Sequence, residues 1–263
     1  MPTPARSPLS VCVVSGAEAH RIGRMLESVA DWAAEILVVL DDRAQDDTAA
    51  IVERVGGRVF REPWKGFVGQ KNSASDRASQ PWLLNLDADE VVSPALGRQI
   101  RDAITTSPPS SPAFEFPRCT YYCGRWIRHG DWYPDRVTRL WRRGRARWVG
   151  EEPHARLEVD GGIGRLSADL LHFSNDRIAG QIAKIAPYHA DFVKHRVAAG
   201  KSAGLFELAL RPAWRFLRAY FLRRGFLDGW PGFYIAALSA FSTLTRYTMV
   251  REAELDRHPT PVP

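Results

Sequence analysis

The chain has 263 residues, of which 45% are hydrophobic and 25% are charged. This balance is ordinary for a globular protein and excludes disordered, collagen-like and coiled-coil chains. The length suits one large domain, or one domain with an appendage. Only three cysteines are present, Cys12, Cys119 and Cys123, which excludes a disulfide framework and indicates a reducing compartment. No further ligands at a suitable spacing complete a zinc site at Cys119 and Cys123.

The excess of basic residues lies in the second part of the chain. The net charge is +6 and the pI is near 9.5. Residues 1–100 carry 11 basic and 14 acidic side chains, whereas residues 101–263 carry 25 and 16. The first part is therefore suited to acidic chemistry, and the second either faces an anionic partner or is simply well solvated.

Strands and helices are expected to alternate over the first 90 residues. Short apolar runs predict strands at 9–14, 36–40, 58–60 and 82–86, with helices at 22–29, around 50–55 behind a cap at Asp46 or Asp47, and at 70–78. This alternation is typical of βαβ units that form a parallel sheet. Because ligands bind at the carboxyl ends of such strands, we expect Ser15, Asp41 and Asp87 to face one crevice.

The pattern changes after Pro109. Residues 113–173 form short alternating segments broken by Gly and Pro, which are typical of antiparallel hairpins, and residues from 181 onward are expected to be helical. The proline-rich tail, 258–263, is expected to fray. The N-terminus lacks the long apolar core of a secretory signal.

The longest uncharged stretch is 229–245. Its 17 residues touch the lower limit for a membrane-spanning helix, which is about 17–25 residues. Pro231, Gly232 and several hydroxyl groups argue against a span. We expect a buried or interfacial helix here.

The sharpest chemical signal is the segment LLNLDADE at 83–90. Its apolar strand delivers Asp87 and Asp89 to the carboxyl edge of the sheet. One carboxylate can then bind a divalent cation, Mg²⁺ or Mn²⁺, while the other reaches a second ligand or a ribose hydroxyl. In the alternative interpretation, both carboxylates only cap the turn before Pro94.

Several motifs together resemble one enzyme family. They are SVCVV (10–14), EILVV (35–39), GFVGQKN (66–72), LDADE (86–90), WYPD (132–135), LWRRG (140–144), DLLHFS (169–174) and RPAWRF (211–216). Over about residues 9–250 the chain resembles glycosyltransferase family 2, most closely the bacterial lipopolysaccharide-core β-glucosyltransferase branch. The resemblance implies the α/β GT-A fold, a Rossmann-like, mostly parallel sheet with helices on both faces, here followed by a C-terminal helical appendage.

The resemblance also implies an activity and an organisation. The activity is inverting, metal-dependent transfer of a sugar from a nucleotide-sugar donor, a UDP-hexose, to a lipopolysaccharide-core or other glycolipid acceptor, with Mg²⁺ or Mn²⁺ as cofactor. We expect a nucleotide-sugar-binding half at 1–112, an acceptor-binding half of the same domain at 113–180, a helical, membrane-proximal region at 181–256, and a tail at 257–263.

Donor-binding residues follow from the positions of the family motifs. Asp41 would bind the uracil ring by accepting its N3–H, and Ser15 and Glu18 would lie near the nucleoside. Lys71 would meet the diphosphate. Alternatively, Asp41 caps a helix or turn, and Lys71 is a solvated surface lysine. The segments SGAE (15–18) and DRAQ (42–45) depart from the family pattern, which affects the preference for base or donor sugar.

Metal ligands follow in the same way. Asp87 would meet ribose or metal, and Asp89 and His172 would bind the metal. His172 lies in the apolar run Leu170–Phe173, so a core histidine is the alternative.

The best candidates for the general base are Glu151 and Glu152. Inversion requires a base that takes the proton of the acceptor hydroxyl, and two adjacent carboxylates raise one another's pKa when they are close. The resemblance places an acid at Glu151 and a histidine at His154, whereas the glutamate usual after that histidine is Ala155 here. We favour Glu151. A solvated acidic turn is the alternative.

The second half interleaves arginines with aromatic residues. The stretch 211–226 contains five arginines, Arg211, Arg215, Arg218, Arg223 and Arg224, among bulky apolar residues. Such a stretch can hold a protein electrostatically at an anionic bilayer. The expected location is the bacterial cytoplasm, peripheral on the inner face of the inner membrane. Alternatively, this is an ordinary helix with a charged outer face.

Two rival functions remain at this point. A polyprenyl-phosphate sugar synthase would share the nucleotide-sugar half. A non-enzymatic polyanion- or membrane-binding protein would use only the arginine–aromatic half. That second rival leaves the acidic strand ends unexplained, and because those acids repel nucleic acid we expect no nucleic-acid partner.

Overall fold

The computed structural model describes residues 6–106, 111–151, 155–174 and 177–257. The chain forms two compact units. The first comprises 1–119 and 135–173, and the second comprises 120–134 and 174–263.

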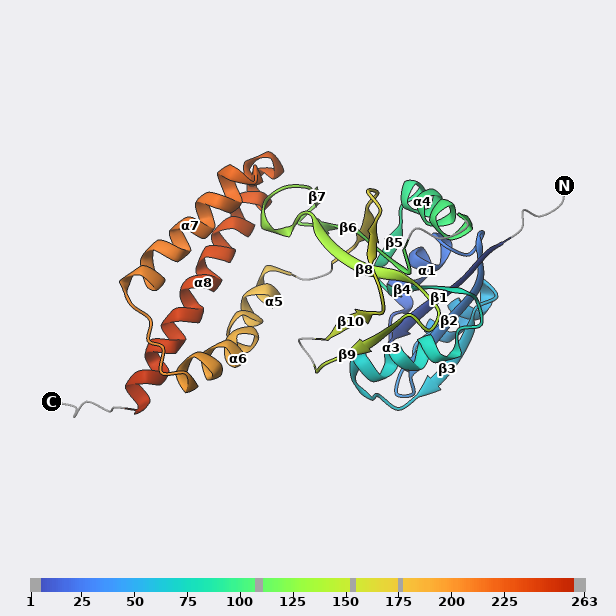
Figure 1. The fold of residues 1–263 in the computed structure, drawn as a ribbon, viewed down its shortest axis with the longest axis horizontal. Coiled ribbons are helices and arrows are strands. Elements are labelled where there is room, and N and C mark those ends of the chain that lie inside the picture. Colours follow the sequence, from blue (N-terminus) through green and yellow to red (C-terminus); the bar gives the residue numbers. More distant parts are fainter. Residues whose placement is uncertain (1–5, 107–110, 152–154, 175–176, 258–263) are drawn as a thin grey trace. The chain divides into compact units, whose positions relative to one another are not determined.

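The first unit is built on one mixed sheet (Figure 1). The strands of this unit are β1 (Ser7–Ser15), β2 (Ala33–Asp41), β3 (Arg58–Glu62), β4 (Trp82–Asp87), β5 (Glu90–Val92), β6 (Ala113–Tyr122), β8 (Asp135–Arg142), β9 (Ala146–Val149), β10 (Arg156–Val159), β11 (Ile163–Arg165) and β12 (Leu170–His172), of which β9 and β10 lie outside the main sheet. Its helices are α1 (Ala19–Glu27), α2 (Thr48–Arg54), α3 (Gly66–Arg77) and α4 (Pro94–Thr105).

The sheet is parallel in its first half and mixed in its second. The strand order is β3-β2-β1-β4-β8-β6-β12-β5. Strands β3, β2, β1 and β4 are parallel, whereas β8 pairs antiparallel with both β4 and β6. Strands β9 and β10 form a separate antiparallel hairpin. The expected βαβ alternation and the later hairpins are both confirmed.

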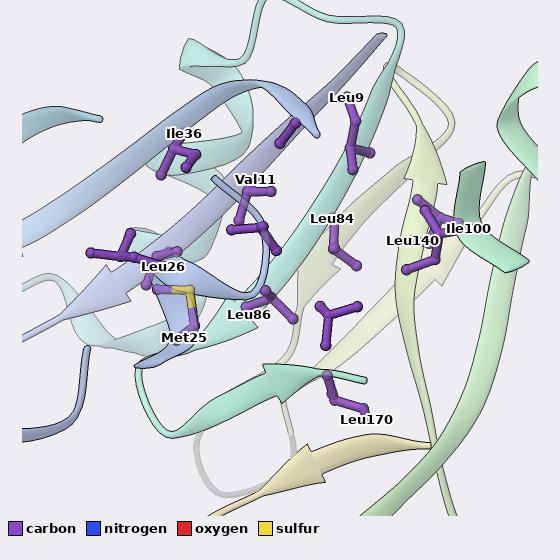
Figure 2. Close-up of a cluster of buried hydrophobic side chains, with 14 of the residues drawn as sticks. Leu9, Val11, Met25, Leu26, Ile36, Leu84, Leu86, Ile100, Leu140 and Leu170 are labelled. Carbon is purple, nitrogen blue, oxygen red and sulfur yellow. The ribbon is translucent and has the colours of Figure 1, made fainter. Parts of the chain in front are cut away.

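Alternating side chains of β1 divide the core between the two faces of the sheet. Leu9, Val11 and Val13 are fully buried in the cluster that also holds Met25 and Leu26 of α1 (Figure 2). Other buried residues pack on the opposite face, and they include Cys12 of β1, Leu83 of β4 and Ala74 of α3. Because successive residues of a strand point to opposite faces, the short apolar runs suit strands that are covered on both sides.

Asp46, rather than Asp47, satisfies the start of α2. Its carboxylate accepts hydrogen bonds from the backbone N–H of Thr48 at 3.1 Å and of Ala19 at 2.9 Å. The same side chain therefore joins the first turns of α1 and α2. The N-cap position, Asp47, makes no capping hydrogen bond through its side chain.

The second unit is mainly helical, as expected from residue 181 onward. Its elements are β7 (Arg125–Ile127), η1 (Gly130–Trp132), α5 (Ile178–Ala183), α6 (Ile185–Ala198), η2 (Phe206–Leu210), α7 (Arg211–Leu217), η3 (Arg218–Leu222), η4 (Gly225–Asp228) and α8 (Gly229–Arg257). Both α6 and α7 pack against α8.

Pro231 and Gly232 do not interrupt α8. Pro231 lies in its first turn, where a backbone N–H has no partner within the helix, so proline is tolerated. Gly232 is required by close packing, because a β-carbon there would collide with the carbonyl oxygen of Gly225. None of the helices within the described part of the chain is long and apolar enough to cross a bilayer.

Candidate active site

A cavity of about 1020 Å³ opens at the carboxyl ends of β1, β2 and β4. Ser15, Asp41 and Asp87 all line it, which confirms the expected crevice. Its lining also includes four further residues expected at the site, namely Glu18, Lys71, Asp89 and His172. The described structure thus brings together every donor- and metal-site residue expected from the sequence.

Asp87 lies between two cations. Its carboxylate is 3.1 Å from Nζ of Lys71 and accepts a hydrogen bond from Nη2 of Arg139 at 2.6 Å. Burial raises the pKa of Asp87, but Arg139 and Lys71 outweigh burial and hold that pKa well below its usual range. Lys71 is buried rather than a solvated surface lysine. Burial and the charge of Arg139 lower the pKa of Lys71, and Asp87 opposes them.

The second carboxylate that binds Arg139 is that of Glu90, which is fully buried. One carboxylate oxygen of Glu90 accepts hydrogen bonds from Arg139 and Arg118, each at 3.2 Å, and the other accepts the backbone N–H of Asp87 at 3.0 Å. Arg139 also donates to Oδ1 of Asn85 at 3.0 Å. A buried carboxylate is tolerated only when it is paired and hydrogen-bonded, and Glu90 meets both conditions. The hydrogen bonds of the buried Glu90 therefore stabilise the turn between β4 and β5.

Asp89 points to a different set of partners. Its Oδ2 lies 3.5 Å from Nε2 of His172 and 3.3 Å from a guanidinium nitrogen of Arg21, which is itself paired with Glu18. The pairing of β5 with β12 explains this meeting, because Glu90 lies opposite His172 in the ladder. The backbone N–H of Phe173 also donates to the carbonyl of Asp89 at 2.9 Å.

The Asp89–His172 pair fits a divalent cation. A carboxylate oxygen and an imidazole nitrogen lie side by side on the wall of the cavity, and both are ligand types that Mn²⁺ and related metals accept. Mg²⁺ sites combine one or two carboxylates with the phosphates of a substrate. Among the residues described, His, Cys, Asp and Glu side chains form no cluster of three or more suited to a metal.

Trp148 forms another wall of the cavity. Asn72 of α3 bonds to both backbone groups of Trp148, donating to its carbonyl at 2.9 Å and accepting its N–H at 3.0 Å. The ring lies 4.6 Å from Nζ of Lys71. These contacts join the β9–β10 hairpin to α3 and keep an aromatic face beside the lysine.

Asp41 is held by Arg43. The guanidinium donates to both oxygens of Asp41, at 3.0 and 2.7 Å, and the backbone N–H of Arg43 donates as well. These bonds lower the pKa of Asp41 to about 2. A nucleobase that uses Asp41 must therefore share or displace Arg43, whose side chain is 73% exposed.

Of the two candidate bases, only Glu151 lies within the described residues. Glu151 is exposed and follows β9, between the cavity residues Trp148 and Ala155, but it does not itself line the cavity as described. Glu152 lies outside the described residues.

Sequence reasoning gave no site role to Glu90, Arg118 or Arg139. Glu90 ends the LDADE motif, and both arginines lie in the segment 113–173, for which antiparallel hairpins were expected. An arginine at an inward-facing position of a predicted strand is the signal that could have identified Arg139, because a buried guanidinium requires carboxylate partners.

Comparison with known proteins identifies the family to which this chain belongs. The family model for glycosyl transferase family 2 matches residues 10–159. The chain belongs to glycosyltransferase family 2. The resemblance noted in the sequence is thereby confirmed. The chain is a glycosyltransferase, which rules out the non-enzymatic alternative.

Two relatives are similar along most of their length. An uncharacterized glycosyltransferase of Rickettsia felis is 31% identical, with 94% of this chain and 90% of the relative covered. The lipopolysaccharide core biosynthesis glycosyltransferase LpsC of Rhizobium meliloti is 30% identical, with 95% and 96% covered.

Solved structures confirm the GT-A fold. S. aureus TarS 1–349 in complex with UDP-GlcNAc matches with a TM-score of 0.52 at 15% identity, covering 93% of this chain and 92% of that one. The mannosyltransferase PcManGT of Pyrobaculum calidifontis, in complex with GDP-Man and Mn²⁺, matches with a TM-score of 0.51 at 14% identity, covering 99% and 89%.

Removing the guanidinium of Arg139 should destabilise the protein. Arg139→Ala leaves Glu90 and Asp87 each with one cation fewer, and we expect the free energy of unfolding in urea to fall by about 3 kcal/mol. Arg147→Ala is the matched control, because Arg147 pairs with Asp76 at the exposed surface and its loss should cost less than about 1 kcal/mol. Equal effects of the two substitutions would contradict the role assigned to Arg139.

Proposed function

We propose that this glycosyltransferase transfers a hexose, with inversion, from a UDP-sugar to a lipopolysaccharide-core or other glycolipid acceptor at the inner face of a bacterial inner membrane. The observation that carries the proposal is the arrangement of Asp87, Asp89 and Lys71 in one cavity. This arrangement offers one carboxylate that two cations already neutralise, a second beside His172 that pairs with Arg21 and could bind a metal ion, and an ammonium group for the diphosphate.

The donor is assigned from the charged and polar residues that line the cavity. Asp41 would accept the N3–H of uracil at the end of β2, with Ser15 and Glu18 nearby on the wall of the cavity. Lys71, pre-positioned by Asp87 and Trp148, would bind an oxygen of the diphosphate. The UDP-GlcNAc of TarS and the GDP-Man of PcManGT support a nucleotide sugar as the donor class.

We assign the divalent cation to Asp89 and His172, and Asp87 lines the same cavity. A divalent cation held there would supply positive charge for the diphosphate leaving group. Mn²⁺ in the PcManGT complex supports this assignment. Arg21 already pairs with Asp89 and can balance its charge in the absence of the cation.

The acceptor class is inferred from LpsC and from the rim of the cavity. LpsC is similar along nearly its whole length and is named for lipopolysaccharide core biosynthesis. Arg136 and Arg156 line the cavity with side chains that are 37% and 66% exposed. Exposed guanidinium groups suit an acceptor that carries phosphate or carboxylate groups.

Transfer is a single displacement at the anomeric carbon. The acceptor hydroxyl attacks from the face opposite the diphosphate, the new glycosidic bond forms as the bond to the diphosphate breaks, and the hydroxyl proton passes to the base. We assign that role to Glu151, which lies in the loop between two segments of the cavity wall. Lys71 stabilises the charge on the departing diphosphate.

The metal assignment predicts that Asp89→Ala abolishes turnover, to below about 1% of the wild-type rate, since an electrostatic contact in the transition state is worth at least about 10²-fold. The release of UDP from a UDP-hexose, with and without acceptor, measures turnover, and circular dichroism checks the fold. Asp102→Ala, on the exposed side of α4, is the control and should be fully active. Full turnover in excess EDTA would refute the metal assignment.

The base assignment predicts that Glu151→Gln lowers kcat by about 10²–10⁴-fold, because the amide cannot take the proton. Donor binding, followed by UDP titration, should be retained because the proposal gives Glu151 a role at the acceptor hydroxyl and Glu151 does not line the cavity. Glu152→Gln is made in parallel. A wild-type rate for Glu151→Gln together with an inactive Glu152→Gln would move the role to Glu152.

A further inference from the structure

Exposed apolar side chains are concentrated in one segment of the second unit, residues 205–233. We call this segment the apolar surface. Its exposed members are Leu205, Phe206, Leu210, Trp214, Leu217, Phe221, Leu222, Phe226, Leu227, Trp230 and Phe233. By contrast, the first unit exposes only three large apolar side chains within its described residues, Trp64, Phe67 and Ile163. An exposed concentration of this kind marks an interaction site rather than ordinary surface.

The spacing of these residues places them along one side of a helical run. From Phe206 through Leu210, Trp214 and Leu217 to Phe221, successive members lie three or four residues apart across η2, α7 and η3. The small residues Pro212 and Ala219 are the buried ones in this run. Leu208, Phe216 and Tyr220 are partly buried, so the run also packs inward through some bulky side chains. Its five exposed apolar residues nevertheless leave an apolar side that no described residue covers, which differs from a helix that buries its apolar face.

The arginines of the same segment are already engaged. Arg215, Arg218 and Arg223 converge on the carboxylate of Asp131, at 2.6, 2.8 and 3.3 Å. The side chain of Asp131 is only 2% exposed. Arg211 lies over the rings of Phe206 and Tyr247. The sequence predicted arginines that face an anionic bilayer or, alternatively, solvent, whereas these four are bound to Asp131 or lie over aromatic rings.

The Asp131 cluster nevertheless keeps a surplus of positive charge. Three guanidinium groups meet one carboxylate, so two positive charges remain beside the apolar surface. Because the arginine side chains are between 31% and 46% exposed, their outer N–H groups can still bond to phosphate oxygens. Every phospholipid headgroup carries a phosphate, including that of a zwitterionic lipid.

We propose that the apolar surface inserts into the boundary between headgroups and acyl chains of a phospholipid bilayer, with the Asp131-bound arginines at the level of the phosphates. Trp and Phe on one side of a helix and arginine beside them are the composition of a helix that lies in this boundary. The purpose of insertion, which is to bring the enzyme to a lipid-linked acceptor, rests on the proposed function. Insertion itself depends on the second unit alone.

This mode of attachment differs from electrostatic binding in its response to salt. Surface charges are screened as the Debye length falls from about 10 Å at 0.1 M salt to about 3 Å at 1 M, whereas burial of apolar surface is not weakened by salt. Insertion therefore predicts binding to neutral vesicles that persists at high salt. An electrostatic anchor predicts binding only to anionic vesicles and release at high salt.

The test is flotation of the full chain with phosphatidylcholine vesicles, with and without phosphatidylglycerol, at about 0.1 M and about 1 M NaCl. Wild type should float with both kinds of vesicle at both salt concentrations. Trp214→Ser/Phe221→Ser should weaken binding by at least about tenfold, because two inserted rings are lost. Tyr188→Ser/Leu255→Ser is the matched control, since it removes exposed apolar side chains of the same unit outside the apolar surface, and it should bind within about twofold of wild type.

Three results would overturn the proposal. The first is no flotation with neutral vesicles, or release at high salt, which would leave an electrostatic anchor. The second is equal loss of binding in the two double variants. The third is a wild-type dimer in lipid-free buffer that Trp214→Ser/Phe221→Ser converts to monomer, which would assign the surface to a second copy of the chain.

UDP titration of the same samples separates this proposal from the proposed function. Vesicle binding by a protein that binds no UDP would leave insertion standing and remove the donor assignment. Trp214→Ser/Phe221→Ser should bind UDP as wild type does, and loss of UDP binding in it, with loss of helical circular dichroism, would show misfolding. The single variants Trp214→Ser and Phe221→Ser then repeat the vesicle test, and each should still weaken flotation.

Discussion

The guanidinium of Arg139 bonds to Asn85, Asp87 and Glu90 at the carboxyl end of β4, and the geometry of the cavity depends on this contact. Three acidic side chains, those of Asp87, Asp89 and Glu90, lie within four residues at the end of β4, so without cations between them they would repel one another. Arg139 reaches two of the three from β8, the antiparallel neighbour of β4. A strand of the antiparallel part of the sheet, β8, thus stabilises the carboxylates at the end of the parallel strand β4.

Because Arg139 binds Asp87 and not Asp89, the two aspartates of the LDADE motif have different partners and different proposed roles. The carboxylate of Asp87 is neutralised by Lys71 and Arg139. It therefore positions the lysine and does not present an unpaired negative charge to the cavity. Asp89 is turned towards Arg21 and His172. A divalent cation competes poorly for a carboxylate that already binds two cationic groups. We therefore assign the proposed cation to Asp89, which pairs with one guanidinium and lies beside His172.

Much of the fold was predictable because its strands are short, apolar and buried on both faces. The runs at Leu9–Val14 and Ile36–Leu40, and the acidic residues that end the strands, identify the sheet and the edge where ligands bind. The GT-A fold and the enzyme class followed from motifs such as LDADE. The cavity then confirmed that Ser15, Asp41 and Asp87 lie together.

Other features depend on pairings between distant segments that no local pattern encodes. His172 reaches Asp89 through a ladder of two three-residue strands, which are too short to be recognised by periodicity. The arginines of α7 and η3 were expected to face solvent or lipid, because nothing in their own segment reveals the buried Asp131. Likewise, Arg43 covers Asp41 through side-chain geometry alone.

The most direct test of the account is the coupling between UDP and Mn²⁺ binding, measured by calorimetric titration of the wild-type protein and of His172→Ala. If a cation at Asp89 and His172 contacts the diphosphate, Mn²⁺ should tighten UDP binding to wild type by about tenfold or more, within the range typical of coupled ligands. His172→Ala should lose most of that gain and still bind UDP through Lys71. Equal UDP affinity of wild type with and without Mn²⁺ would contradict the account.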